Sequence, residues 1–171
     1  MEKHVKSLMR NYLVFIKNKL QKANFLSRLT RIRIFKVYMI SKINHLLPLI
    51  CLNGYLVESW KTIRKIIFRN ILEKQTTPLE TMISLGLGYF NLIIKPMLKL
   101  INKEYKFSKN DVHYKFVKSA AQNALIHWKK LEEKLPEEID TAITEMINGE
   151  KWFEASELEK KDIHKYWKKA L

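Results

Sequence analysis

Apolar residues recur every three or four positions along most of the chain, a spacing typical of α-helices. The clearest example is residues 55–72, whose apolar positions form a single stripe: Leu56, Trp60, Ile63, Ile67 and Ile71. Lys61, Lys65 and Arg69 fall on a different face of the same stretch. This separation predicts a helix that packs one face against a core.

The same spacing predicts helices along the rest of the chain, at approximately 5–22, 29–46, 90–105, 111–135, 136–148 and 156–169. The second helix is expected to end before Pro48, because a residue that precedes proline avoids the helical conformation. Turns are expected at Asn53-Gly54 and at Leu85–Gly88. With only 4 Gly and 4 Pro, the chain has few turn residues for a protein of many short strands. The sequence therefore predicts an all-α bundle of about five to seven helices.

The helices at 29–46 and 55–72 are joined by a short loop, so we expect them to form an antiparallel pair. The first of them is apolar on nearly all sides, which is typical of a buried central helix. In the expected pair, the side chains of the second helix pack on those of the first: Trp60, Ile63 and Ile67 on Phe35, Met39 and Ile43.

Positive charge is concentrated in the first two thirds of the chain. Residues 1–109 hold 21 Lys and Arg against 5 Asp and Glu, whereas residues 110–171 hold 11 against 12. We therefore expect a basic helical region at 1–109 and a near-neutral helical extension at 110–171, which meet at the polar stretch 106–111. An AT-rich genome that favours lysine codons is the alternative explanation, but it would raise the lysine content of both regions.

A region rich in Lys and Arg with few interspersed acids attracts polyanions. Residues 1–70 carry 15 Lys and Arg, and Glu2 and Glu58 are their only acids. We therefore expect binding to nucleic-acid phosphates, without sequence preference because no base-reading motif is visible. The candidate binding residues are Arg28, Arg31, Arg33, Lys36, Lys42, Lys61, Arg64, Lys65 and Arg69. The alternative is that these cations only form a solvated face.

The sequence predicts no catalytic site, no metal site and no cofactor. Only three aspartates occur and no two are neighbours, so a carboxylate pair for two magnesium ions is not evident. The chain lacks an HExxH pattern, and Gly86-Leu87-Gly88 lacks the Lys-Ser/Thr of a phosphate-binding loop. His45 and the single cysteine, Cys51, are expected to be interior or capping residues. The chain is therefore expected to have no enzymatic activity of its own.

No segment is expected to span a membrane. The longest uncharged run, Ile43–Val57, has 15 residues, whereas a spanning helix needs about 20 apolar ones. The apolar run near the N-terminus, Tyr12–Ile16, is too short for a secretory signal. A single cysteine excludes an internal disulfide framework, so we expect a reducing, intracellular compartment.

Three consecutive stretches each carry a motif of their own that is more specific than helical spacing. In RIRIFKVYMISKINHLLPLI the motif residues are Lys36, Tyr38, Lys42, Asn44, His45 and Pro48. In ESWKTIRKIIFRNIL they are Trp60, Ile63, Arg64, Lys65 and Phe68. In QTTPLETMISLGLGYFNL they are Thr77, Pro78, Gly86, Leu87, Gly88, Asn91 and Leu92. Together the stretches resemble the region after the polymerase palm in non-LTR (LINE-type) retrotransposon reverse transcriptases, with Leu85 at the place of the family's first glycine.

The resemblance covers roughly residues 27–100 and implies a helical thumb that holds a template–primer duplex by its backbone. RNA or an RNA–DNA hybrid is the partner it implies, and the nucleus is the location if the chain derives from such an element. The family's Tyr/Phe-x-Asp-Asp palm motif is missing here, and a single cysteine excludes the usual zinc ligand sets. The resemblance therefore implies a truncated, non-catalytic fragment, and residues 110–171 stay open as a surface for a protein partner.

Other classes of function fit the same composition. One is a helical structural protein of a ribosome or organelle whose basic half faces RNA. Another is a peripheral membrane protein whose basic amphipathic helices lie on anionic lipid. A third is the product of a pseudogene without a function.

Overall fold

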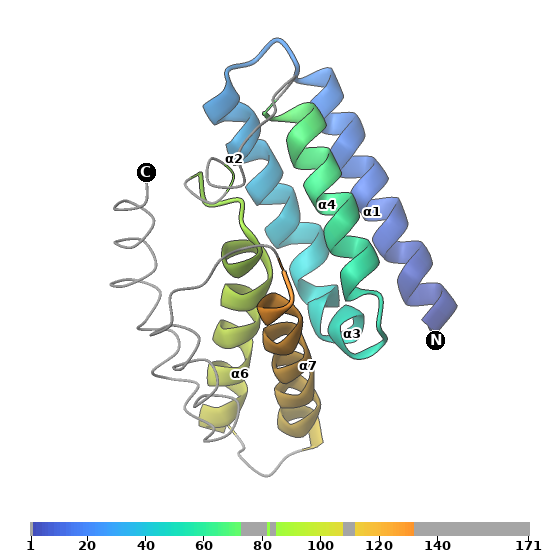
Figure 1. Cartoon of the computed structure of the whole chain (residues 1–171), viewed down its shortest axis with the longest axis vertical. Coiled ribbons are helices and arrows are strands. Elements are labelled where there is room, and N and C mark those ends of the chain that lie inside the picture. The colour runs from blue at the N-terminus through green and yellow to red at the C-terminus, as the bar shows by residue number, and fades with distance from the viewer. Residues whose placement is uncertain (1, 73–81, 83–84, 108–111, 132–171) are drawn as a thin grey trace. The chain divides into compact units, whose positions relative to one another are not determined.

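The computed structural model describes residues 2–72, 82, 85–107 and 112–131 (Figure 1). Within these residues the chain is helical and contains no strand, which confirms the predicted all-α class. The chain divides into two compact units, Met1–Thr77 and Pro78–Leu171.

Four α-helices form the first unit: α1 (Glu2–Lys22), α2 (Arg28–Tyr38), α3 (Leu47–Leu52) and α4 (Leu56–Asn70). α1 carries one apolar stripe, and all of its members are buried: Val5, Met9, Leu13, Ile16 and Leu20. Helix α1 packs against both α2 and α4. It runs parallel to α4, and α2 runs antiparallel to both (Figure 1).

The stripe predicted at 55–72 is buried as expected, from Leu56 through Ile71. The expected antiparallel course of α2 and α4 is confirmed, because Arg31 near the start of α2 bonds to Asn70 at the end of α4. The apolar residues of the expected pairing are all buried: Phe35, Met39, Ile43, Trp60, Ile63 and Ile67. Direct contact between the two groups stays a prediction.

The helix that was expected to end before Pro48 continues beyond it. Its path from Arg28 to Leu52 passes through a π-helix, η1 (Met39–Ile43), and a 3-10 helix, η2 (Asn44–Leu46), before α3. Leu47, directly before the proline, keeps helical angles of φ −54° and ψ −44°. Pro48 is the second residue of α3, where the N–H that proline lacks has no partner in that α-helix. A change of helix type thus replaces the expected break.

This continuous helix, Arg28–Leu52, is long and apolar enough by length and composition to cross a membrane. The expectation that no segment spans a membrane rested on an uninterrupted run of about 20 apolar residues, and Arg31, Arg33, Lys36 and Lys42 interrupt this helix. In the structure, 44% of the helix's most apolar window is buried. A core helix of a bundle passes the same test, so the finding is weak evidence for a span.

The second unit contains a π-helix, η3 (Phe90–Ile94), and the helices α6 (Lys95–Phe107) and α7 (Val112–Lys129). The turn predicted at 85–88 precedes η3. Gly86 has a φ of 73°, in the left-handed region that glycine adopts without strain. The amide of Leu87 donates to the carbonyl of Met82 over 3.0 Å, on the far side of Gly86.

Two buried aromatic residues at the start of η3 attach it to α7. The Tyr89 hydroxyl donates to the carbonyl of Ala124 over 2.9 Å. The Phe90 ring lies 4.9 Å from the ring of Trp128, centroid to centroid. Helices α6 and α7 pack against each other along their length (Figure 1). They flank the charge boundary expected at 106–111, so the compact units do not coincide with the charged and neutral regions.

The predicted range 90–105 is occupied by η3 and α6, and α7 occupies most of 111–135. The helices predicted at 136–148 and 156–169 lie outside the described residues.

Candidate nucleic-acid interface

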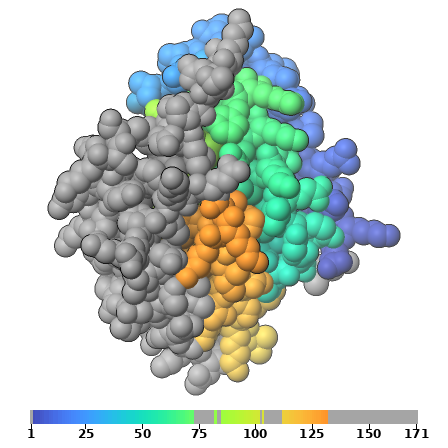
Figure 2. Space-filling model, in the orientation of Figure 1, coloured from blue at the N-terminus to red at the C-terminus, as the bar shows by residue number. Residues whose placement is uncertain are grey.

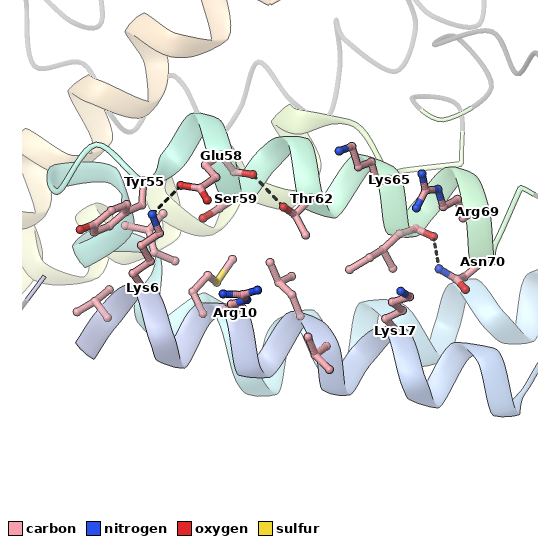
Figure 3. Close-up of a pocket in the computed structure, with 16 residues that line it drawn as sticks. Lys6, Arg10, Lys17, Tyr55, Glu58, Ser59, Thr62, Lys65, Arg69 and Asn70 are labelled. Atoms are coloured by element: carbon pink, nitrogen blue, oxygen red, sulfur yellow. Dashed lines mark hydrogen bonds and ion pairs between the residues drawn. The ribbon is translucent and has the colours of Figure 1, made fainter. Parts of the chain in front are cut away.

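A groove of about 510 Å³ lies between α1 and α4 in the first unit (Figure 3). On the face shown in Figure 2, these two helices form adjoining bands of surface. The groove has a buried apolar floor: Val5, Met9, Leu13, Ile50 and Ile66. Its rims carry cations from both helices: Lys6, Arg10 and Lys17 from α1, and Lys65 and Arg69 from α4.

On each rim, one pair of charged residues has the same spacing along its helix. Lys6 and Lys17 lie eleven residues apart on α1, and Glu58 and Arg69 lie eleven residues apart on α4. Eleven residues make about three helical turns, or about 16 Å, so each pair returns to one face of its helix. Because α1 and α4 run parallel, Lys6 lies beside Glu58, and Lys17 lies at the Arg69 end of the groove (Figure 3).

Among the described residues, Glu58 is the single acid that lines the groove, and it is paired. Its Oε2 atom lies 3.3 Å from Nζ of Lys6, and both side chains are more than half exposed. The Lys6 ammonium also lies 5.3 Å from the centroid of the Tyr55 ring. An exposed pair of this kind contributes little to stability, but it neutralises the negative charge that Glu58 brings to the groove.

The other four groove cations have no such partner: Arg10, Lys17, Lys65 and Arg69. None of them makes an ion pair with any residue in the described part of the chain. All four are exposed at the surface. Positive charges gathered along one concave surface raise the local concentration of anions.

Four of the predicted binding residues lie on α4, and the structure separates them. Lys65 and Arg69 line the groove. Lys61 is exposed but is not among the lining residues. Arg64 lies on another face, with its guanidinium carbon 5.6 Å from the centroid of the Phe68 ring.

The other predicted residues belong to α2 and η1, and none of them lines the groove. Arg28 and Arg33 are exposed, whereas Lys36 and Lys42 are half-buried. The ammonium of Lys42 lies 5.7 Å from the centroid of the Phe15 ring of α1.

Arg31 has a structural role that the sequence analysis did not foresee. Its side chain is only 6% exposed, and Nη1 donates a hydrogen bond to the backbone carbonyl of Asn70 over 3.0 Å. That carbonyl belongs to the last turn of α4, where backbone carbonyls have no amide donor within the helix. Arg31 is therefore not exposed at the surface. Its burial argues against the predicted role in binding nucleic acid, and its hydrogen bond links two helices.

The α1 cations Lys6, Arg10 and Lys17 were not among the predicted binding residues. Lysines and arginines on an amphipathic helix are ordinary, and only the packing of α1 beside α4 gives these three a shared groove. The repeated eleven-residue spacing on the two helices was a signal, but it acquires meaning only once the parallel pairing is known.

The residues considered for catalysis do not form a site. Cys51 is buried as expected, and burial raises the pKa of its thiol to about 12. His45 was expected to be an interior or capping residue; it is exposed, so it is not interior, and its ring lies edge-on to that of Tyr12 at 6.0 Å. The described residues hold no cluster of three or more His, Cys, Asp or Glu side chains that could bind a metal ion.

No family model, curated protein or solved structure matches the chain. The resemblance to retrotransposon reverse transcriptases therefore stays a prediction.

Proposed function

We propose that this chain binds the phosphate backbone of nucleic acid in the groove between α1 and α4, without sequence preference and without catalysis. The observation that carries the proposal is a set of four cations along one groove that make no ion pair with any described residue: Arg10, Lys17, Lys65 and Arg69. Glu58, the carboxylate that lines the described part of the groove, is paired with Lys6.

The length of the cationic surface favours a polyanion over a single phosphate. Arg10 and Lys17 are seven residues apart on α1, which is about 10 Å along the helix. One phosphate group would contact both only if the two side chains folded toward each other, whereas a chain of phosphates can contact them where they lie. The guanidinium groups of Arg10 and Arg69 can each offer two parallel N–H donors to one phosphate.

The neutral polar side chains of the groove support binding without sequence preference. The Thr62 hydroxyl donates to the carbonyl of Glu58, and the Asn70 amide donates to the carbonyl of Ile66, each over 3.1 Å. These donors are engaged by their own helix, which leaves the charged side chains as the main donors toward a ligand. Contacts from such cations to phosphates position a backbone but do not read a sequence.

The proposal agrees with the thumb-like role that the sequence resemblance implies, in which an RNA or RNA–DNA hybrid backbone is held and a separate palm would carry the chemistry. It also fits an RNA-associated structural protein, since both would use the same groove.

The test compares two variants that lose equal charge. The groove variant replaces Arg10, Lys17, Lys65 and Arg69 with Gln. The control variant replaces four exposed lysines that do not line the groove: Lys3, Lys99, Lys103 and Lys115. Binding of a labelled RNA–DNA hybrid is measured by fluorescence anisotropy across a range of salt concentrations.

If four phosphates are neutralised in the groove, log K should fall with log salt with a slope of about −3 to −4 from those contacts. The groove variant should lose most of that slope and bind all sequences more weakly, while the control keeps it. An equal loss in both variants would mean that only the net charge of +15 attracts nucleic acid, and the groove assignment would fail.

A further inference from the structure

A stripe of exposed apolar side chains runs from the turn before α2, along α2 and into η1. Leu29 is 64% exposed, Val37 is 60% exposed and Ile40 is 66% exposed. Phe25, in the turn before α2, is 80% exposed. Large apolar side chains exposed together in this way mark a surface that contacts something less polar than water.

The helical spacing explains why these residues form one surface. Leu29, Val37 and Ile40 are separated by eight and three residues, which returns them to the same face of a helix. Phe35, which is fully buried, lies about 120° or more around the helix from each of them, and Ile32 lies at the border between the exposed and the buried face. The helix is therefore apolar on two sides, and only one of them is used by the bundle.

The charge around the stripe indicates what covers it. No acidic residue occurs between Lys3 and Val57, and this stretch holds 11 Lys and Arg. Arg33 lies within the stripe, and Lys22 and Arg28 are exposed beside the turn that carries Phe25. A second copy of the chain seated on this face by twofold symmetry would bring Arg33 and its neighbours against themselves, without a counter-charge.

We infer that the α2 stripe, Phe25, Leu29, Val37 and Ile40, docks on an anionic lipid surface. Apolar side chains beside the exposed cations Lys22, Arg28 and Arg33 suit the boundary between acyl chains and anionic headgroups. Arg31 holds α2 to α4 through the carbonyl of Asn70, so α2 lies on the membrane as part of its bundle and does not cross it.

The stripe is separate from the α1–α4 groove, since none of its residues lines that groove. Lipid binding and nucleic-acid binding can therefore be tested with different variants. The stripe variant replaces Leu29, Val37 and Ile40 with Gln. A matched control replaces three exposed apolar residues elsewhere: Val57, Val112 and Ile126.

Co-sedimentation is measured with phosphatidylcholine vesicles that contain or lack phosphatidylglycerol. The unmodified chain should bind only the anionic vesicles. The stripe variant should bind them roughly tenfold or more weakly, because its buried apolar area is lost, and the control should bind as the unmodified chain does. Equal binding by the stripe and control variants would overturn the inference, as would unmodified protein that sediments equally with neutral vesicles.

A solvent-sensitive dye locates the contact independently of affinity. Asn24→Cys places the dye beside Phe25, and Ser7→Cys places it on an exposed position of α1. Cys51 is buried, so the dye attaches at the introduced thiol. Anionic vesicles should shift the emission at position 24 to the blue and leave position 7 unchanged. A shift at both positions or at neither would contradict docking through the stripe.

Two further outcomes would also overturn the lipid assignment. The unmodified chain could form a dimer in sedimentation analysis that the stripe variant does not form, which would make the stripe an interface between copies. Alternatively, the stripe variant could lose affinity for the RNA–DNA hybrid and keep its affinity for vesicles, which would place nucleic acid on this face.

Discussion

Nη1 of Arg31 lies 3.0 Å from the backbone carbonyl oxygen of Asn70, 39 residues further along the chain. The bond joins the first turn of α2 to the last turn of α4. It satisfies a carbonyl that has no partner within its own helix, and it does so with a side chain that is almost fully buried.

Replacing Arg31 with Ala should therefore destabilise the first unit. A hydrogen bond to a charged donor is worth about 1.5–3 kcal/mol, and its loss leaves a carbonyl unsatisfied. Arg33→Ala, on the exposed face of the same helix, should change the free energy of unfolding by less than about 0.5 kcal/mol. Urea unfolding of the two variants makes the comparison, and equal stabilities would show that the Arg31 bond is not a structural link.

Trp60→Ala should cost more than any surface change in α4. The Trp60 side chain is 2% exposed, and truncation of a buried tryptophan costs about 3–5 kcal/mol through lost burial and the cavity left behind. Val57→Ala, one turn earlier and 44% exposed, serves as the control. A loss well below 1 kcal/mol for Trp60→Ala in urea unfolding would mean that the apolar stripe of α4 does not face a core.

The stability of the second unit should depend on His127 below neutral pH. Burial, with the charge of Lys130 as a second cause, lowers the pKa of His127 below its ordinary 6.5. Its Nε2 atom is buried without a hydrogen-bond partner among the described residues, and its ring lies 5.4 Å from that of Tyr89. Protonation would place an unpaired charge at that position.

Because the folded pKa is the lower one, the unfolded chain binds more protons between the two values. The contribution of His127 is thus complete above pH 6.5 and is lost as the pH falls through the folded pKa. The free energy of unfolding should decrease over this window, and His127→Gln should remove part of the decrease. His113→Gln, an exposed position on the same helix, should leave the profile unchanged. Identical pH profiles for the two variants would contradict the assignment.

Cys51 should react slowly with thiol reagents while the chain is folded. Its thiol is buried, and a pKa of about 12 leaves almost no thiolate at neutral pH. Reaction with an aromatic disulfide should be at least tenfold faster in denaturant than in native buffer, because unfolding restores an ordinary thiol pKa near 8.5. Equal rates in the two conditions would mean that Cys51 is accessible in the folded chain.

Local periodicity was enough to predict the α-helical class and the buried face of α4. Trp60, Ile63 and Ile67 recur at helical spacing, and all three are buried. The continuation of the helix past Pro48 was not predictable by the same reasoning. The rule for residues before proline is statistical, and here a π-helix and a 3-10 helix absorb the geometry.

The candidate site could be predicted only in part, because it depends on which helices become neighbours. Lys65 and Arg69 were recognised from the charge of one helix, and the structure places them in the groove. Arg31 looks like any other cation in the sequence, and only its burial against Asn70 shows that it serves the fold. Lys17 gains its position from the parallel pairing of α1 with α4, a long-range contact that periodicity does not encode.

Protection of lysines from acetylation, measured by mass spectrometry with and without a saturating RNA–DNA hybrid, tests the groove most directly. The groove predicts strong protection of Lys17 and Lys65, whose exposed amines would face phosphates. Lys3, Lys99 and Lys115 are exposed outside the groove and should be acetylated at the same rate in both samples. Uniform protection of all five lysines, or protection confined to the last three, would contradict binding between α1 and α4.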